Sequence, residues 1–340
     1  MHATAIHRPT ARTAHGWLPV RRSATFMTVA TPGKAGDYHL PVMPAEVAEW
    51  MAAGPDSFII DATLGGGGHS EIFLQSGARV LGTDRDPDAL AHTRERLAGF
   101  GGRLDTWEGN FSRLADLPAI RSGERATGLL LDLGVSSRQL DSAARGFSFQ
   151  REGPLDMRMD PSNPSTAAAI VNGWSAADLT RLLFEVGEES KARRITAAIV
   201  KRRAERPFET TTELAACIER AIGRHGRIHP ATRSFQALRM TVNRELESLA
   251  AVLAATPAVL KPGGRLLILT YHSLEDRIVK RFLRQHTAPF IDDPGWPEAR
   301  PNPERQFRLL ARKAIAPTPA ESASNPRSRS AKLRVAQLLD

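Results

Sequence analysis

The sequence has 340 residues, of which 41% are hydrophobic and 24% charged, a composition typical of a folded chain of about two domains rather than a disordered one. No apolar run approaches the roughly 18 residues that a membrane-spanning helix needs. The single cysteine, Cys217, excludes a disulfide framework and a thiolate zinc cluster, and it favours a reducing, cytoplasmic location. The net charge of +9 indicates a polyanionic partner.

Residues 1–36 carry arginine and lysine but no acid, and they show no apolar periodicity. Pro9, Gly16 and Pro19 would interrupt a helix, which argues against an amphipathic transit peptide. We expect a disordered N-terminal extension here, or a start codon assigned too early, since Met27 offers a second start.

From Val42 onward, strand-like and helix-like patterns alternate with short loops, as in a parallel sheet with crossover helices. The pattern predicts helices at 44–53, 69–76 and 87–98, and strands at 57–62, 79–83, 104–107 and 127–132. A loop rich in glycine, serine, proline and aspartate follows at 133–164. The first part of the chain is therefore predicted to be an α/β domain.

Three helical segments without an intervening strand then follow, at 175–186, 190–204 and 211–222, and the second is expected to turn its basic residues outward. Alternation returns with one long helix at 234–255, a strand at 265–271, a helix capped by Ser273 and Asp276, and two final strands at 306–313 and 331–338. These elements predict a small helical domain inserted into a mostly parallel sheet that an antiparallel hairpin closes.

The sharpest local motif is an apolar strand that runs into a glycine loop and opens a helix, with the sequence FIIDATLGGGGHS at 58–70. Glycines let a ligand lie directly on the backbone, and the start of a helix offers free N–H donors. Asp84 ends the next predicted strand, where a carboxylate can accept both hydroxyls of a ribose. The motif indicates a site for an adenosine-containing cofactor.

Three interpretations of this motif stay open on these residues alone: an S-adenosylmethionine site, a nicotinamide site and a structural turn. The dinucleotide pattern G-x-G-x-x-G fails at its last position, where Ser70 stands. Asp61 precedes the loop, and an acid there repels a pyrophosphate but suits an ammonium group. These two residues favour S-adenosylmethionine.

Further motifs extend along the chain: LLLDLGVSSRQLD at 129–141, RGFSF at 145–149, GPLDMRMD at 153–160, FQALR at 235–239, VNREL at 242–246, YHSLEDR at 271–277 and NPRSRSAKLR at 325–334. Together they closely resemble the RsmH (MraW) family of bacterial methyltransferases of small-subunit ribosomal RNA, over roughly residues 37–340. The resemblance implies a class I (Rossmann-like) methyltransferase that uses S-adenosyl-L-methionine, with a mostly parallel seven-stranded sheet. It further implies methylation of N(4) of a cytidine in the decoding region of 16S rRNA within the 30S subunit, without a metal or a membrane.

The same resemblance divides the chain into the extension at 1–36, a methyltransferase core at 37–138 and 234–340, and an inserted loop and helical domain for substrate recognition at 139–233. It assigns the cofactor contacts to Gly67, Gly68, His69, Asp84, Phe111, Asp132 and Gln139. On the residue types alone, Phe111 also suits a core position and Gln139 a solvated loop.

The catalytic residues are predicted from the chemistry of the acceptor. A cytosine amine is a poor nucleophile, so the enzyme must orient it and relieve its developing positive charge. Asp132 ends the fourth strand, where other amine methyltransferases place an acceptor, although Leu133-Gly134-Val135 replace the usual proline pair. We predict that Asp132 accepts a hydrogen bond from the amine or from the cofactor ammonium, and that His272 faces the same cleft as a proton acceptor or orienting group. The alternative for His272 is that it only precedes a helix cap.

Two departures from the family are visible, namely Thr270-Tyr271 where Ser-Phe is usual and the extension at 1–36. Tyr271 is expected to lie near the site and to tune substrate contacts. The segment from Asp156 to Asp160 is either a salt-bridged loop or part of a site. Functionally, a ribosome-assembly binding protein that has lost methyl transfer is the alternative to an enzyme, and the intact glycine loop favours the enzyme.

Four arginines are predicted to bind RNA: Arg202, Arg203, Arg327 and Arg329. The first two belong to the basic helix of the insertion, and the last two follow the turn at Asn325-Pro326. Solvated surface charge is the alternative for each. No metal site is expected, because glycine and proline deny a helix to the pair His225 and His229. The oligomeric state stays open.

Overall fold

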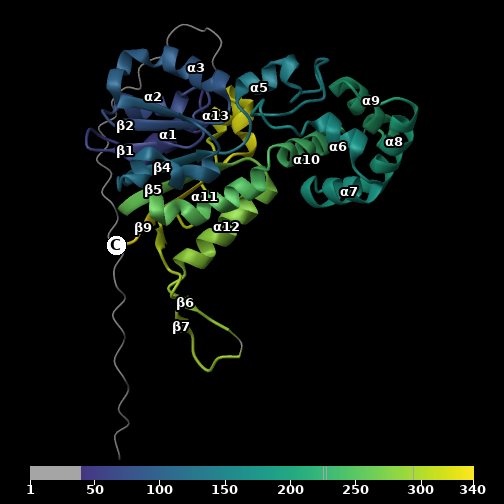
Figure 1. The fold of residues 1–340 in the computed structure, drawn as a ribbon. Helices are drawn as coiled ribbons and strands as arrows, with labels where there is room; N and C mark the ends of the chain where they lie inside the picture. The colour runs from purple at the N-terminus through teal and green to yellow at the C-terminus, as the bar shows by residue number, and fades with distance from the viewer. Residues whose placement is uncertain (1–39, 225, 227, 294) are drawn as a thin grey trace, which may run out of the picture. The chain divides into compact units, whose positions relative to one another are not determined.

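A seven-stranded sheet organises the part of the chain that the computed structural model describes, residues 40–340 without 225, 227 and 294 (Figure 1). The expected extension at 1–36 and His225 lie outside the described residues. The strands are β1 (Phe58–Asp61), β2 (Arg79–Asp84), β3 (Leu104–Glu108), β4 (Ala126–Asp132), β5 (Leu260–Thr270), β8 (Phe307–Leu309) and β9 (Lys332–Leu338). Their order is β3-β2-β1-β4-β5-β9-β8.

The first five strands pair in parallel, and β9 pairs antiparallel with both β5 and β8. This confirms the predicted class I fold with its mostly parallel sheet. The last two strands do form an antiparallel pair, but β9 lies between β5 and β8. The sheet order reverses at β1 and β4, and in such sheets ligands bind outside the carboxyl ends of the strands at this point.

Helices cover both faces of the sheet: α1 (Pro44–Met51), α2 (Gly68–Gln75) and α3 (Pro87–Arg96) follow the early strands, and α4 (Pro118–Arg121), α11 (Glu245–Val259) and α12 (Ser273–Thr287) come later. Alternate side chains of β4 pack on opposite faces of the sheet, because successive residues of a strand point to opposite sides. Leu130 packs in one hydrophobic cluster with side chains of α1 and α2. Leu129 and Leu131 pack in the other with side chains of α11 and α12. Among the described residues, no helix is both long and apolar enough to cross a membrane.

The segment between β4 and α11 is largely helical and has a hydrophobic cluster of its own. It comprises α5 (Ser137–Asp141), α6 (Ala167–Gly173), α7 (Ala176–Arg181) with a π-helix at Leu182–Val186, α8 (Ala192–Glu205), α9 (Thr211–Ile222) and α10 (Thr232–Val242). Of these, α6 was not predicted, and α5 lies within the segment 133–164 that was predicted to be a loop. Phe235, Leu238 and Val242 of α10 pack in this cluster, so the apolar side of α10 faces the insertion although the expected boundary precedes it.

The single helix predicted at 234–255 is wrong, because the structure breaks it into α10 and α11. Arg244 adopts a left-handed backbone with φ of 49° at the break. The Asn243 side chain holds the break open: its amide donates to the carbonyl of Met157 at 2.7 Å, and its oxygen accepts from the N–H of Met159 at 2.8 Å. Helical spacing of apolar residues continues on both sides, so periodicity alone does not reveal the turn.

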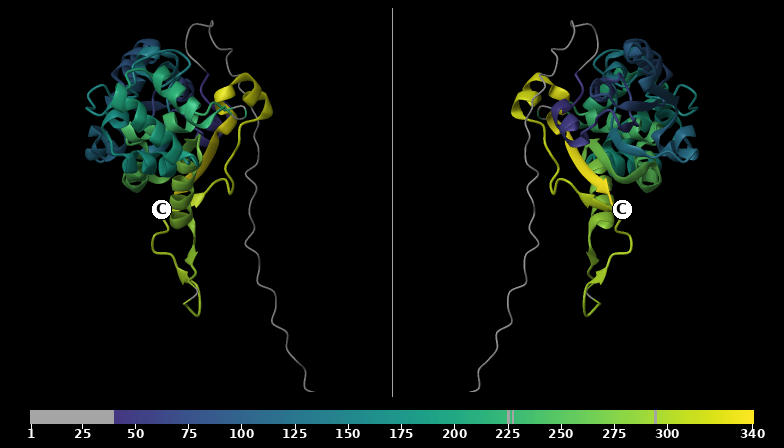
Figure 2. Two further views of the ribbon diagram at one scale, coloured as in Figure 1. Left: turned by 90° about the vertical axis from the view of Figure 1, so that its right-hand side faces the viewer. Right: turned by 90° about the vertical axis from the view of Figure 1, so that its left-hand side faces the viewer.

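Three other local differences concern the last third of the chain. The start of α12 is capped by His272 and Glu275, not by Ser273 and Asp276. Asp276 instead pairs with Lys332 and Arg334 on β9. A short hairpin of β6 (Phe290–Ile291) and β7 (Arg300–Pro301) extends beyond the end of α12, and α13 (Pro319–Ser324) forms in the loop before β9 (Figure 1, Figure 2). Neither was predicted.

Candidate functional site

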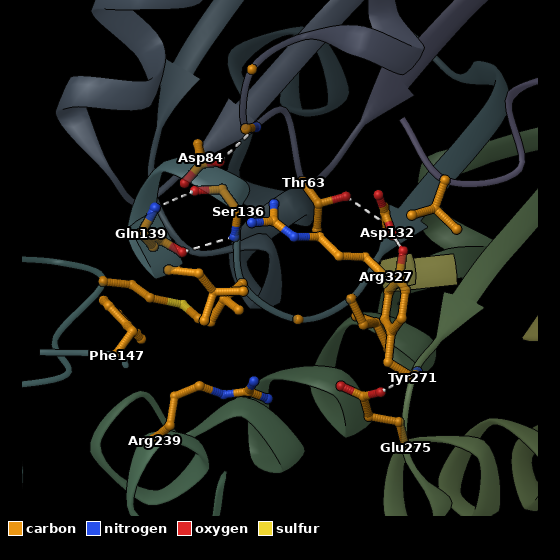
Figure 3. Close-up of a pocket in the computed structure, with 18 of the residues that line it drawn as sticks. Thr63, Asp84, Asp132, Ser136, Gln139, Phe147, Arg239, Tyr271, Glu275 and Arg327 are labelled. Atoms are coloured by element: carbon orange, nitrogen blue, oxygen red, sulfur yellow. Dashed lines mark hydrogen bonds between the residues drawn. The ribbon is translucent and has the colours of Figure 1, made fainter. Parts of the chain in front are cut away.

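A cavity of about 600 Å³ lies at the carboxyl ends of the parallel strands. One wall consists of strand ends and the loops after them, including Thr63, Gly65, Gly66, Gly68, His69, Asp84, Arg85, Phe111, Asp132, Tyr271 and His272. The opposite wall belongs to the insertion and α10, including Phe147, Phe149, Met159, Phe235, Gln236 and Arg239. Figure 3 shows the two walls facing each other, with Arg239 opposite Ser136 and Tyr271 beside Asp132. Most of the predicted cofactor residues therefore meet in one place.

The glycine loop is fixed from two directions. The N–H of Gly65 donates to Oδ2 of Asp84 at 2.8 Å, which ties the loop to the end of β2. The carbonyls of Gly65 and Gly66 accept from Thr93 at 2.8 Å and from Arg96 at 2.7 Å, which ties it to α3. The loop backbone is thus preorganised at the edge of the cavity, as a close-lying ligand requires.

Gly67, whose contact with the cofactor stays a prediction, has a structural role in the loop. Gly67 is absent from the cavity wall, and its N–H donates to the carbonyl of Leu64. A Cβ on Gly67 would lie 2.6 Å from Thr93 Cγ2 and 2.9 Å from a Leu97 methyl, so this glycine serves the packing of α3. Gly68 does line the cavity, with Pro41 packed closely against it.

Asp84 ends β2 with both carboxylate oxygens directed by backbone donors. Oδ2 accepts from Gly65 and Oδ1 accepts from the N–H of Asp86 at 2.9 Å. Burial raises the pKa of the Asp84 carboxyl, and the two N–H donors lower it in part. Each oxygen retains lone-pair capacity for a further donor. A carboxylate fixed in this way beside a glycine loop fits the ribose hydroxyls of S-adenosylmethionine.

Gln139 is 5% exposed, so the solvated alternative does not apply to it. Its amide nitrogen donates to Asp86 at 3.0 Å, and its amide oxygen accepts from the N–H of Ser136 at 3.0 Å. It lines the cavity, where it links the loop after β4 to the loop after β2. Phe111 belongs to the hydrophobic core and also lines the cavity, and its contact with the cofactor stays a prediction.

Asp132 lies at the end of β4 between two polar side chains. The Tyr271 hydroxyl donates to its Oδ1 at 2.5 Å, and Nδ1 of His69 lies 3.6 Å from its Oδ2. Burial raises the pKa of the Asp132 carboxyl, while His69 and the Tyr271 hydroxyl lower it in part. Nε2 of His69 lies 2.9 Å from the carbonyl of Val42, which requires a proton on that nitrogen. Asp132 is therefore a directed hydrogen-bond acceptor facing the cavity.

Asp61 does not play the part that its sequence position suggested. It is 1% exposed and does not line the cavity. Its oxygens accept from the Ser70 hydroxyl at 2.7 Å and from the N–H of Thr63 at 3.2 Å. Asp61 is buried inside the strand-to-helix turn, whereas Asp132 at the end of the neighbouring strand lines the cavity.

His272 lines the cavity, but its ring is engaged by its own helix. Nδ1 accepts from the N–H of Glu275 at 3.3 Å, and Nε2 lies 2.9 Å from Oε1 of Glu275 without hydrogen-bonding geometry. Glu275 in turn accepts from the N–H groups of Tyr271 and His272. His272 therefore caps α12, as its alternative interpretation expected, and its role as a proton acceptor or orienting group stays a prediction.

The two predicted RNA-binding arginines of α8 are directed into the protein. Arg203 donates to the carbonyls of Val171 at 2.6 Å and Trp174 at 2.7 Å, which closes the end of α6. Arg202 lies over the ring of Phe208 and donates to the carbonyl of Arg206. These contacts correct the expectation that α8 turns all its basic residues outward.

Arg327 and Arg329 lie on the 3₁₀ turn Pro326–Ser330 and point to different surroundings. Arg327 lines the cavity and donates to both oxygens of Asp141 at 3.2 and 3.3 Å. Arg329 is exposed and donates to the carbonyl of Ser322 at 3.4 Å. The pair therefore offers one cation to the cavity and one to the outer surface.

Several residues of the site were quoted in motifs but given no role. Arg239 and Glu245 form a bidentate ion pair with both distances at 2.9 Å, and Arg239 lines the cavity. Residues three or four positions apart face each other on a continuous helix, and these two oppositely charged residues are six apart. This spacing is the sequence signal that could have suggested a break between two helices. Asp156 and Arg158 form a bidentate pair at 2.9 and 2.8 Å, which makes this segment a salt-bridged loop. Within the described residues, no three His, Cys, Asp or Glu side chains gather as metal ligands.

Comparison with known proteins agrees with this geometry. Residues 37–339 match the MraW methylase family. The chain is 48% identical to the ribosomal RNA small subunit methyltransferase H of Thermomicrobium roseum over 303 residues, which cover 88% of this chain and 93% of that protein. It is 45% identical to the protein of the same name from Carboxydothermus hydrogenoformans over 304 residues, which cover 88% and 98%.

A solved rRNA methylase from Streptococcus thermophilus aligns over 87% of this chain and 94% of its own, at 12% identity and a TM-score of 0.39. Similarity at this level bears on neither the fold nor the function of this chain. The family match, in contrast, spans nearly all the described residues and both walls of the cavity. The cofactor of this chain is S-adenosyl-L-methionine, which the glycine loop, Asp84 and Asp132 fit. The chain belongs to the MraW methylase family.

Proposed function

We propose that this protein transfers a methyl group from S-adenosylmethionine to the exocyclic N(4) amine of a cytidine in the decoding region of 16S rRNA. The observation that carries the proposal is the two-walled cavity, in which Asp132 from the sheet faces aromatic and polar side chains of the insertion and α10. The names of the relatives from Thermomicrobium roseum and Carboxydothermus hydrogenoformans support small-subunit rRNA as the substrate.

The sheet wall would hold the cofactor. Gly65, Gly66 and Gly68 offer a backbone surface, Asp84 offers acceptors for the ribose, and Phe111 offers an apolar ring for the adenine. When bound, S-adenosylmethionine supplies a methyl group activated on a positively charged sulfur. The protein side of the reaction is then to position an amine and to manage its proton.

Asp132 would perform this positioning. The cytosine amine has little nucleophilic character because its lone pair is delocalised into the ring. A hydrogen bond from the amine to Oδ2 of Asp132 would orient that group, and a carboxylate would stabilise the positive charge that develops on it. Oδ1 is held by Tyr271, so the carboxylate is oriented before the substrate arrives. The nitrogen finally loses one proton, which the ionised Asp132 is placed to accept.

The insertion wall would receive the base. A base must leave its stack to enter a closed pocket, and aromatic side chains compensate for the lost stacking. Phe147, Phe149 and Phe235 line this wall, and Phe149 and Phe235 meet edge to face at a centroid distance of 4.8 Å. Gln236 and Arg239 add polar groups that suit the carbonyl and ring nitrogen of cytosine. In this proposal the insertion, residues 139–233, recognises the substrate together with α10, and the sheet wall of residues 37–340 holds the cofactor.

Arg327 would contact the RNA backbone beside the target nucleotide. Its guanidinium lies at the cavity rim and is held by Asp141 of α5. An arginine fixed in this way can bind a phosphate without giving sequence preference. Arg329 would add an outer phosphate contact, since it is exposed on the same turn.

The test is methyl transfer with a chemically defined product. The purified protein is incubated with methyl-labelled S-adenosylmethionine and with 30S subunits from a strain that lacks this methyltransferase, and in parallel with naked 16S rRNA. Nucleoside mass spectrometry should find the label in N(4)-methylcytidine at one position. Cofactor binding without any transfer would show a binding protein instead of an enzyme, and label in another nucleoside would refute the cytosine assignment.

A further inference from the structure

A second cavity of about 780 Å³ lies in the insertion, outside the site described above. It forms a groove between α7, the π-helix at Leu182–Val186 and the start of α8. Figure 1 shows α7 and α8 side by side at the end of the insertion that is remote from the sheet. The charged and aromatic side chains that line it are Arg181, Phe184, Glu185, Lys191, Arg193 and Arg194. We refer to it as the α7–α8 groove.

The groove is rich in uncompensated positive charge. Arg193 and Arg194 are exposed, and neither has an ion pair within the described part of the chain. Arg181 pairs with Asp178 at 2.7 Å, and Lys191 donates to the carbonyl of Ile222 at 3.3 Å. Glu185 is the single carboxylate in the lining. With Arg181 neutralised by Asp178, three cations stand against Glu185, and this excess of positive charge attracts a polyanion.

The position of these cations destabilises helix α8. Lys191 is the N-cap of α8, and Arg193 and Arg194 stand in its first turn, which has no acidic residue. Positive charge at this end opposes the helix dipole, which favours acids there. The buried Glu189 accepts from the N–H of Lys191 but lies outside that turn. These cations destabilise the start of α8. Binding of an anion in the groove would explain why they are there.

Phe184 gives the groove an aromatic surface. It is 63% exposed, whereas Leu182 and Leu183 beside it are 5% and 2% exposed. The segment forms a π-helix, a rare form that occurs frequently at functional sites. An exposed phenylalanine flanked by free arginines is suited to stack an unpaired base whose neighbouring phosphates bind the guanidinium groups.

The α7–α8 groove also lies close to the proposed catalytic cavity. The π-helix packs on α10 through Gly187, where a Cβ would lie 3.3 Å from Ala237 Cβ of α10. Phe235, Gln236 and Arg239 of the same helix line the catalytic cavity. The groove and the cavity are thus lined by neighbouring helical segments that pack on each other.

We propose that the α7–α8 groove binds a single-stranded segment of the RNA substrate, with a base stacked on Phe184 and phosphates held by Arg193 and Arg194. This rests on the proposed function, because it assumes an RNA substrate. It assigns RNA anchoring to the exposed start of α8, in place of Arg202 and Arg203 at its other end.

The experiment measures the affinity of the full-length protein for 30S subunits that lack the modification, between about 50 and 200 mM salt. The double variant Arg193→Gln/Arg194→Gln should reduce the slope of log affinity against log salt by about 1 to 1.5, the value for two lost phosphate contacts on a single strand. Phe184→Ala should weaken binding about fivefold or more with an unchanged slope, because stacking is not ionic. The charge-matched control is Arg281→Gln/Arg284→Gln on the exposed side of α12, which should change neither quantity.

Two further readouts separate the groove from folding and from the chemistry. All variants should bind S-adenosylmethionine as the wild type does, and they should reach the wild-type single-turnover rate at saturating 30S subunits. If the wild type neither binds subunits nor methylates them, the proposed function fails. If the wild type does both but the Arg193/Arg194 variant keeps its salt slope, the groove proposal fails. Weaker binding of that variant with an unchanged slope would indicate a protein contact and would also overturn it.

Discussion

The Tyr271 hydroxyl donates a 2.5 Å hydrogen bond to Oδ1 of Asp132, across the adjacent ends of β5 and β4. Burial and the neighbouring Asp132 raise the pKa of Tyr271 well above its ordinary value. Tyr271 therefore stays protonated and acts as a donor that holds the carboxylate.

Tyr271→Phe tests this relationship. The Tyr271 hydrogen bond lowers the pKa of Asp132 against the effect of burial, so its loss should raise that pKa further. Because the proposed reaction needs ionised Asp132, the acidic limb of the single-turnover pH profile should move to higher pH. The rate below that limb should fall about tenfold or more, as expected for a lost hydrogen bond to a charged group. A variant with the wild-type pH profile would show that Tyr271 does not tune Asp132.

His272 is best tested by comparing two substitutions. As the N-cap of α12, it accepts from the N–H of Glu275, and a serine at this position can do the same. His272→Ala should lower the free energy of unfolding by about 0.5 to 2 kcal/mol. His272→Ser should retain most of the stability and the wild-type methylation rate. A hundredfold slower rate in a stable His272→Ser protein would instead support the histidine as a proton acceptor.

The glycine loop offers a matched pair of variants. Gly67→Ala should destabilise the fold by about 2 kcal/mol or more, because φ is 74° and the new Cβ would clash with Thr93 and Leu97. Gly68→Ala should have a smaller effect on the thermal midpoint but should weaken S-adenosylmethionine binding about tenfold, because Gly68 lines the cavity. Thermal unfolding and calorimetry measure the two effects. Equal losses of affinity in both variants, at full stability, would contradict the assignment.

Asp84→Ala should weaken S-adenosylmethionine binding by about 1.5 to 3 kcal/mol, the range for hydrogen bonds to a charged group. The same change removes the acceptor for the N–H of Gly65, so the loop loses one of its fixed points. Asp105→Ala on β3, an exposed acid outside the cavity, is the control and should bind normally. Unchanged calorimetric affinity in the Asp84 variant would show that this acid does not hold the ribose.

The sheet was predictable from sequence because its signals are local. Apolar runs such as Leu129–Leu131 and the glycine loop after β1 depend on neighbours along the chain. The break at Asn243 was not predictable, since its side chain is satisfied by Met157 and Met159, which lie more than 80 positions away. Helical spacing shows which residues of a segment are apolar. It does not show where a backbone group far away in the sequence will form a hydrogen bond with the segment.

The directions of polar side chains were the least predictable part of the site. Arg203 sits in a basic helix, yet the carbonyls of Val171 and Trp174 draw it inward. Asp61 and Asp132 each end a strand, but only Asp132 opens to the cavity, because Ser70 covers Asp61. The direction of a polar side chain depends on which hydrogen-bond partner the tertiary fold brings within about 3 Å of it. The residue type alone does not predict that partner.

The most direct test of the account is the nucleoside content of 16S rRNA in a strain that lacks this methyltransferase and is complemented with the wild type or with Asp132→Asn. Asparagine keeps the size of the side chain but cannot accept the amine proton as a carboxylate does. We predict that the wild type restores N(4)-methylcytidine at one decoding-region position and that Asp132→Asn, expressed at the same level, does not. Restoration to the wild-type level by Asp132→Asn would contradict the account.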